Sequence, residues 1–178
     1  LHSARTQIFT RFFPRCGVPD GLHSWEEHAA YVRFLYETGS IDEATQLWWS
    51  VRPHMDFPTV EIRICDAQPT LEEAQSLVAL MVSLTARCAR AIDEGEPLPE
   101  QPRRLIEENL WRAIRHGLSG ELIDLERGDV LPARARVERL VEWVLPVADE
   151  IGATPWLRLP ERNAAERQIA QRATGATL

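Results

Sequence analysis

Residues 45–66 read TQLWWSVRPHMDFPTVEIRICD, and this stretch decides the fold class. The segments 45–51 and 59–65 are rich in β-branched and aromatic residues, which favour extended backbone. Between them the chain carries Pro53 and Pro58, and proline cannot donate to the hydrogen-bond ladder of a strand. The stretch therefore predicts two β-strands, over 45–51 and 59–65, joined by a loop.

Helical patterns lie on both sides of these strands, with apolar residues recurring every three or four positions. They predict helices over 5–13, 25–38, 71–94, 105–116, 133–151 and 161–174, and a small hairpin is expected over 121–131. Two of the helices begin with the spacing of a capping box, formed by Ser24 with Glu27 and by Thr70 with Glu73. These two starts are the most sharply defined in the sequence.

The length and composition indicate a folded globular chain. It has 178 residues, of which 44% are apolar and 26% charged, and this excludes a disordered or fibrous protein. Helices on both sides of a strand pair predict an α+β fold. We expect a small antiparallel sheet around residues 45–66, with helices packed on one face of it.

The charge and the cysteines limit the partners and the compartment. The 27 acidic and 20 basic residues give a net charge of −7, which disfavours nucleic acid and anionic membranes as partners. No apolar run approaches the roughly 18–20 residues of a membrane span. Cys16, Cys65 and Cys88 have no CxxC spacing, so we expect reduced thiols and a cytoplasmic protein.

The strand over 59–65 places an acid and a base on one side. Strict alternation sets Glu61 and Arg63 on one face of the strand and its aliphatic residues on the other. Charged groups fixed on a rigid strand can hold phosphates and metal ions in register. A solvent-exposed strand that carries a surface ion pair explains the same pattern, and the residues alone leave both interpretations open.

Three further residues are candidates for binding an anionic substrate. Arg52 can reach the same face as Arg63, and two guanidinium groups beside a carboxylate suit a site for carboxylate or phosphate. His54 follows in the loop, where a packing role is the common alternative. Arg115 has no obvious i+4 partner on the 105–116 helix, so substrate contact and plain solvent exposure are equally compatible with its position.

Four runs of sequence carry a resemblance to a known family. They are RTQIF (5–9), WWSVRPH (48–54), TVEIRICD (59–66) and ENLWRA (108–113). In this order they resemble the bacterial glutamate–cysteine ligase type 2 family, also called carboxylate–amine ligases. Members are about twice as long, and no strand of paired glutamates precedes Arg5 here. The resemblance therefore implies that residues 1–178 form the C-terminal part of a single catalytic domain, an incomplete member of the glutamine-synthetase-like superfamily.

The resemblance also implies an activity. Family members are ATP-dependent ligases that phosphorylate the γ-carboxylate of glutamate and let an amine, typically that of cysteine, displace the phosphate to give a γ-glutamyl amide. It implies that Glu61 is a Mg²⁺ ligand, that Arg63 is a catalytic contact to the transferred phosphoryl group, and that Arg52 and His54 lie on the substrate side. Arg115 is a further candidate for substrate binding. ATP and Mg²⁺ are the implied cofactors, and a homodimer is a possible assembly.

Two alternatives remain open at this point. One carboxylate cannot hold two Mg²⁺ ions, so the chain can be an inactive piece that needs a partner segment. It can also be a non-catalytic interaction module, whose helices over 71–94 and 133–151 bury the apolar surface of a partner.

Overall fold

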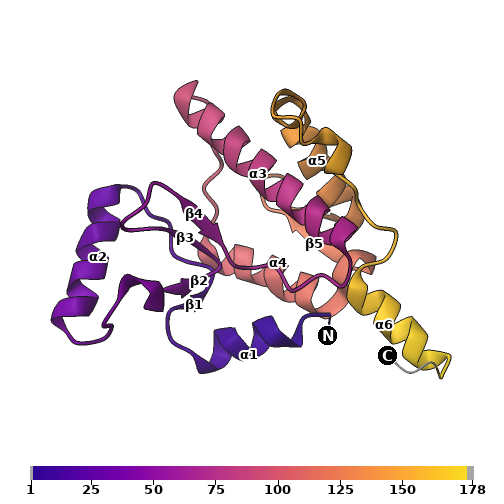
Figure 1. Cartoon of the computed structure of the whole chain (residues 1–178), viewed down its shortest axis with the longest axis horizontal. Helices are drawn as coiled ribbons and strands as arrows, with labels where there is room; N and C mark the ends of the chain where they lie inside the picture. Colours follow the sequence, from indigo (N-terminus) through magenta and orange to yellow (C-terminus); the bar gives the residue numbers. More distant parts are fainter. Residues whose placement is uncertain (1, 176–178) are drawn as a thin grey trace. The chain divides into compact units, whose positions relative to one another are not determined.

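The computed structural model describes residues 2–175, which divide into two units (Figure 1). The N-terminal unit consists of Ala4–Cys65 with Pro102–Glu107, and the C-terminal unit of Leu1–Ser3, Asp66–Gln101 and Glu108–Leu178. Each unit has its own secondary structure and buried residues, and each is described by itself below.

The N-terminal unit contains helices and very short strands. In chain order they are α1 (Ala4–Phe12), β1 (Cys16–Gly17), α2 (Trp25–Glu37), the 3₁₀ helix η1 (Ala44–Gln46), β2 (Trp48–Trp49), β3 (Val51–Pro53) and β4 (Val60–Ile62). Helix α2 begins where the sequence predicts, because the Ser24 hydroxyl accepts a hydrogen bond of 3.0 Å from the backbone N–H of Glu27. The helices predicted over 5–13 and 25–38 are confirmed.

The strands form two small sheets instead of one. β3 and β4 pair antiparallel, with Val51 opposite Ile62, Arg52 opposite Glu61 and Pro53 opposite Val60, whereas β2 pairs parallel with β1. Ser50 connects the two sheets, because its N–H donates to Gly17 and its carbonyl accepts from Arg63. The predicted antiparallel pair is confirmed. The continuous strand predicted over 45–51 is wrong, because 44–46 is a 3₁₀ helix and the chain changes partner at Ser50.

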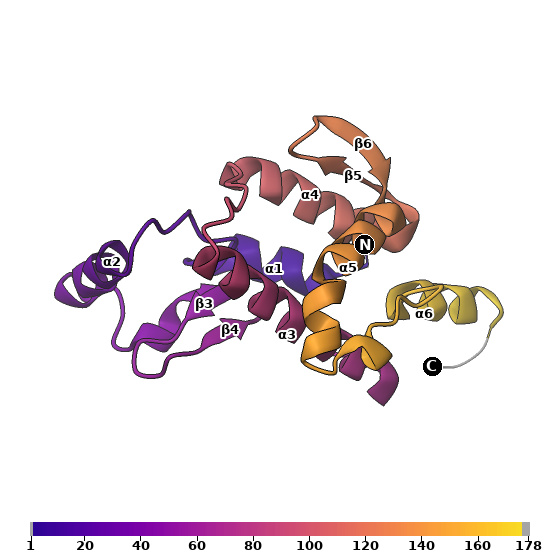
Figure 2. The ribbon, with the colours of Figure 1, turned by 90° about the horizontal axis from the view of Figure 1, so that it is seen from above.

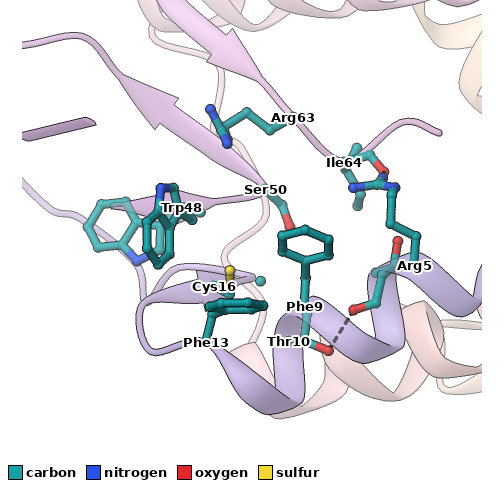
Figure 3. A pocket seen from close by; sticks show the side chains of 12 residues that line it. Arg5, Phe9, Thr10, Phe13, Cys16, Trp48, Ser50, Arg63 and Ile64 are labelled. Carbon is teal, nitrogen blue, oxygen red and sulfur yellow. Dashed lines mark hydrogen bonds between the residues drawn. The ribbon is translucent and has the colours of Figure 1, made fainter. Parts of the chain in front are cut away.

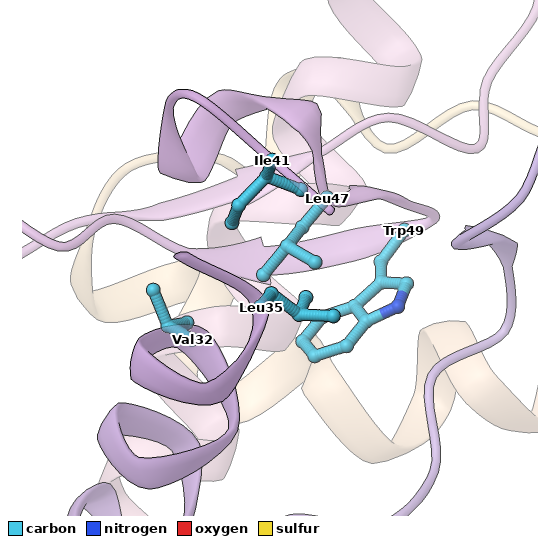
Figure 4. Close-up of a cluster of buried hydrophobic side chains, with 5 residues drawn as sticks. All are labelled: Val32, Leu35, Ile41, Leu47 and Trp49. Atoms are coloured by element: carbon cyan, nitrogen blue, oxygen red, sulfur yellow. The ribbon is translucent and has the colours of Figure 1, made fainter. Parts of the chain in front are cut away.

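The core of this unit lies between α2 and β2. Val32 and Leu35 of α2 pack with Ile41, Leu47 and Trp49, all of them at most 8% exposed (Figure 4). A helix therefore covers one side of the strand region, as expected. The aliphatic side of β4 is different.

Val60 is 51% exposed and Ile64 just beyond β4 is 39% exposed, so the expected helix packing does not reach this side of the strand. Val60 and Ile64 on this side of the strand alternate with Glu61 and Arg63, as the sequence pattern predicts.

The C-terminal unit is mainly helical. Its elements are α3 (Leu71–Asp93), α4 (Arg103–His116, whose first turn belongs to the other unit), η2 (Gly117–Ser119), β5 (Glu121–Asp124), β6 (Asp129–Pro132), α5 (Ala133–Glu150), η3 (Thr154–Trp156) and α6 (Ala164–Ala173). α3 lies beside α5 (Figures 1 and 2), and the buried residues of α3 are small, namely Ala79, Ser83 and Ala91. Small side chains let the two helices approach closely.

The helices and the hairpin predicted for this part of the chain are confirmed within a few residues. β5 and β6 pair antiparallel from Glu121 opposite Pro132 to Asp124 opposite Asp129. The Asp124 carboxylate accepts backbone hydrogen bonds of 3.2 Å from Glu126 and Arg127 and so closes the turn. The fold class is thus a mixture of helices and small sheets, as expected for an α+β chain.

Candidate functional site

Three of the residues singled out from the sequence meet on the β3–β4 pair. The register sets Arg52 directly opposite Glu61, and the Arg52 Nη2 donates to Glu61 Oε2. Arg63 Nη1 donates to the other carboxylate oxygen, Glu61 Oε1, at 3.0 Å. The predicted grouping of one carboxylate between two guanidinium groups is therefore present in the structure.

Arg52 is the buried member of this group. It is 5% exposed, and its Nη1 donates to the carbonyl oxygens of Thr45 at 2.5 Å and Leu47 at 2.8 Å. A guanidinium group bonded to two carbonyls and a carboxylate holds the 3₁₀ segment against the strand pair. Its hydrogen bonds to the protein indicate a structural role for Arg52. The substrate contact implied by the resemblance stays a prediction.

Glu61 is ionised by its neighbours. Desolvation opposes the charge of the carboxylate, but the hydrogen bonds and positive charges of Arg52 and Arg63 outweigh it, and the pKa of Glu61 falls below its ordinary value. Each carboxylate oxygen already accepts from one guanidinium group.

A magnesium site does not form from the residues described here. Within residues 2–175, no group of three or more His, Cys, Asp or Glu side chains is placed so that it could hold a metal ion. Mg²⁺ requires several oxygen ligands in near-octahedral geometry, and Glu61 offers one carboxylate that is already bonded to two arginines. The side chains of residues 2–175 therefore do not by themselves fit the ion, and the role of Glu61 as a metal ligand stays a prediction.

Arg63 lines a cavity of about 300 Å³, here called the Arg63 cavity. Figure 3 shows Phe9 of α1 and Phe13, which follows the end of this helix, facing the side chains of the strand region around Arg63. Phe13 meets Trp48 edge to face, with ring centroids 5.9 Å apart. Twelve residues line it: Arg5, Thr6, Phe9, Thr10, Phe13, Cys16, Gly17, Trp48, Trp49, Ser50, Arg63 and Ile64.

The wall formed by α1 is held in place by two local features. Arg5 donates to the carbonyl oxygen of Cys65 at 3.3 Å, which ties α1 to the segment after β4. Gly17 has a φ of +93°, and a Cβ on it would lie 3.1 Å from the Thr10 methyl group. Glycine at this position therefore lets β1 approach α1 closely.

The Arg63 cavity combines positive charge with aromatic surface. Two guanidinium groups, Arg5 and Arg63, line it together with aromatic rings, and the Arg63 side chain is 36% exposed. Guanidinium groups bind carboxylate and phosphate through paired hydrogen bonds, and aromatic rings stack on planar groups. The arrangement suits a ligand that has an anionic part and a flat part.

The Cys16 thiol in this cavity remains a neutral group. Burial raises the pKa of Cys16, and the nearby charge of Arg63 offsets only part of the effect. A thiol with a raised pKa is a poor nucleophile at neutral pH. The chemistry of the cavity therefore rests on binding and positioning.

His54 and Arg52 line a different cavity. It measures about 380 Å³, and we call it the His28 cavity after its most buried titratable residue. The Nδ1 of His54 accepts a hydrogen bond of 3.1 Å from the backbone N–H of Asp56, and its ring packs on Phe57 at 4.8 Å between centroids. The structure thus shows the packing contacts that are the common alternative for a loop histidine.

His28 is a feature that sequence reasoning missed. It is 1% exposed, its ring packs between those of Trp25 and Trp49, and neither ring nitrogen has a hydrogen-bond partner. Burial lowers its pKa, so the imidazole is neutral at neutral pH. The sequence places it only on an amphipathic helix, and no motif marks it.

Arg115 belongs to a different unit of the chain. It is exposed in the last turn of α4, within the C-terminal unit, whereas Arg52, Glu61 and Arg63 belong to the N-terminal unit. Its neighbour on the helix, Arg112, forms the i,i+4 ion pair with Glu108 at 2.9 Å that the spacing predicts. A substrate contact by Arg115 stays a prediction.

The family model described as glutamate-cysteine ligase family 2 matches residues 1–172. The chain belongs to this family. The resemblance stated from four short runs of sequence is therefore confirmed over nearly the whole chain.

Curated relatives support the same assignment. The chain is 38% identical over 174 residues to "Putative glutamate--cysteine ligase 2" of Solibacter usitatus, a match that covers 95% of this chain and 45% of the relative. Proteins with the same name from Sorangium cellulosum and Chloroflexus aggregans are 39% and 40% identical over 96% and 94% of this chain, and over 46% and 44% of their own lengths. The chain spans about half the length of the curated relatives it matches, as expected for a C-terminal part.

Among residues 2–175, no helix combines the length and the apolar character that crossing a membrane would demand.

Proposed function

We propose that this chain is the C-terminal part of an ATP-dependent carboxylate–amine ligase that forms a γ-glutamyl amide through an acyl phosphate. Family membership supports a ligase, and the printed names of the relatives support glutamate and an amine such as cysteine as substrates. The observation that carries the proposal is the Arg63 cavity, where two guanidinium groups stand beside aromatic rings in a family of ligases.

The proposed reaction has two steps that balance. In the first, a γ-carboxylate oxygen of glutamate attacks the terminal phosphorus of ATP, the bond from that phosphorus to the bridging oxygen breaks, and ADP leaves. In the second, the amine nitrogen attacks the acyl carbon, loses a proton, and inorganic phosphate leaves. In both steps the distribution of negative charge over the phosphoryl oxygens changes, and positioned cations stabilise such charge.

We assign the stabilisation of this negative charge to Arg63. Its guanidinium group lines the cavity and is partly exposed, so it is available to an anionic ligand. Arg5 brings a second positive charge to the same cavity. Both groups would bind the oxygens of the phosphoryl group or of the substrate carboxylate.

Glu61 acts on Arg63 as a positioning residue in this proposal. Its hydrogen bond of 3.0 Å orients the guanidinium group, and Arg52 fixes the other carboxylate oxygen from the buried side. ATP and Mg²⁺ remain the proposed cofactors. We assign no step to the ion, because the described residues gather no set of ligands for it.

The test is an assay of the full-length gene product that carries residues 1–178. With ATP, Mg²⁺, glutamate and cysteine, we expect ADP formation that depends on both amino acids. Arg63→Lys keeps the charge but loses the forked donors, and we expect it to lower turnover by about 10²- to 10³-fold.

Arg127→Lys is the matched control, since Arg127 is exposed in the β5–β6 turn, and its turnover should equal that of the wild type. Absence of ADP formation from the folded wild-type protein, or equal turnover of both variants, would refute the proposal.

A further inference from the structure

Helix α3 has an apolar side that nothing in its own unit covers. Leu71, Val78, Val82 and Ile92 are 69%, 54%, 51% and 69% exposed, and Ala89 is exposed too. Together with Gln75 and Thr85 these positions repeat at alternating spacings of four and three residues, which places them on one line along a helix. We call this line the α3 seam. At 1.5 Å per residue it extends for about 30 Å.

The seam is not the side on which α3 packs against α5. The buried residues of α3 are Ala79, Ser83 and Ala91, and α5 is the helix with which it makes most of its contacts. A surface helix with one buried side normally carries polar and charged residues on its other side. α3 is therefore apolar on two sides, of which only one has a partner in the C-terminal unit.

The charged residues of α3 lie outside the seam, and three of them are held in ion pairs. Arg87 bonds to Glu96, Arg90 to Glu150 and Glu73 to Arg167. From Leu71 to Ile92, no position of the seam carries a charge. An uncharged line of this length, exposed at every position except the half-buried Gln75, is typical of a surface that a protein partner covers.

A second copy of the chain fits the seam poorly. Glu72 lies at its beginning and Asp93 and Glu94 at its end, and all three are exposed. Because both ends are acidic, two copies would bring like charges together in a parallel or in an antiparallel pairing, which is unfavourable.

The length of the relatives indicates another occupant. The match covers 45% of the Solibacter usitatus relative over 174 residues, so about 210 residues of that protein have no counterpart in this chain. We propose that the α3 seam is the surface on which this remaining part of the ligase packs. The inference rests on family membership and goes beyond the proposed reaction, since it concerns assembly and involves neither Arg63 nor its cavity.

The test is coexpression of residues 1–178 with the unmatched part of the Solibacter usitatus relative, followed by copurification without substrates. We expect a one-to-one complex with the wild-type chain. Val78→Asp together with Val82→Asp should weaken the complex by at least about 100-fold, because each change puts a charge where the complex would bury an aliphatic side chain. Ile169→Asp is the control, since Ile169 on α6 is 56% exposed and lies outside the seam, and it should bind like the wild type.

Four results would overturn the inference. The first is failure of the wild-type chain to copurify, and the second is equal binding by the seam variant and the control. The third is a wild-type homodimer that the seam variant alone disrupts, which would make a second copy the occupant. The fourth is a large fall in the melting temperature of the isolated chain on changing the seam, which would show that the seam packs within the chain itself. Since no turnover is measured, these outcomes are separate from failure of the proposed reaction.

Discussion

The Arg63 cavity and the His28 cavity, both in the N-terminal unit, are lined by arginines in opposite environments. At the first cavity the side chain of Arg63 is 36% exposed, and its guanidinium group donates to the Glu61 carboxylate. Arg52 at the second is 5% exposed and bonds two carbonyls as well as the same carboxylate. The comparison shows that alternation along a strand groups charged residues, whereas burial decides which of them is free to meet a ligand.

The largest expected change in the free energy of unfolding is that of an Arg52 substitution. Arg52→Ala removes the donors to Thr45 and Leu47 and leaves those carbonyls and part of the Glu61 charge without partners. We expect it to lower the free energy of unfolding by about 3 kcal/mol or more, which urea denaturation of the chain would measure. A loss below about 1 kcal/mol would contradict the structural role of Arg52.

The packing around the second cavity should be nearly as sensitive. Leu47 is 1% exposed in the core beside α2, and Leu47→Ala would leave a space there. We expect a loss of about 2–5 kcal/mol in the free energy of unfolding. Val78→Ala, at a position 54% exposed on α3, serves as the comparison and should cost far less. Equal losses of stability for both variants would contradict the position of Leu47 in the core.

The buried imidazole gives the second cavity a pH dependence. Since burial lowers the pKa of His28 in the folded chain, the unfolded chain takes up the proton first as the pH falls. The stability that neutral His28 contributes is therefore present above the ordinary pKa of about 6.5 and is lost as the pH falls below it.

His28→Phe keeps an aromatic ring between Trp25 and Trp49 and removes the titration. Melting curves between pH 7.5 and pH 5 should show a shallower loss of stability for this variant than for the wild type. Identical slopes would mean that His28 is hydrated or paired in solution.

The smallest expected change in stability is that of an Arg63 substitution. Its ion pair with Glu61 is partly exposed, and such pairs contribute about 0–1 kcal/mol, so Arg63→Ala should leave the urea midpoint almost unchanged. A loss as large as that of Arg52→Ala would remove the contrast between the two arginines and indicate that Arg63 is a structural residue too.

The sequence was sufficient for the helices and for the grouping on the strands, because both follow from local periodicity. Ser24 and Thr70 mark helix starts through their own side chains, and alternation alone places Glu61 beside Arg63. The antiparallel register then brings Arg52 opposite Glu61. The residues that carry the ion-pair cluster were therefore predictable, although their roles were not.

The cavities were not predictable, because they depend on contacts between residues distant in the chain. Arg5 reaches the carbonyl of Cys65, sixty residues away, and a contact over this distance in the chain brings it to the Arg63 cavity. The run from Arg5 to Phe9 was a signal, since it is one of the four runs of the family resemblance. The burial of His28 left no signal, because helical periodicity does not tell which polar residue will lack a partner.

The most direct test of the central claim is trapping of the acyl phosphate at the Arg63 cavity. The full-length gene product that carries residues 1–178 would be incubated with ATP, Mg²⁺, glutamate and hydroxylamine in place of cysteine, and γ-glutamyl hydroxamate would be quantified. The account predicts hydroxamate from the wild type and from Arg127→Lys, and about 10²-fold less from a folded Arg63→Lys protein. Equal hydroxamate from all three proteins, or none from the wild type, would contradict it.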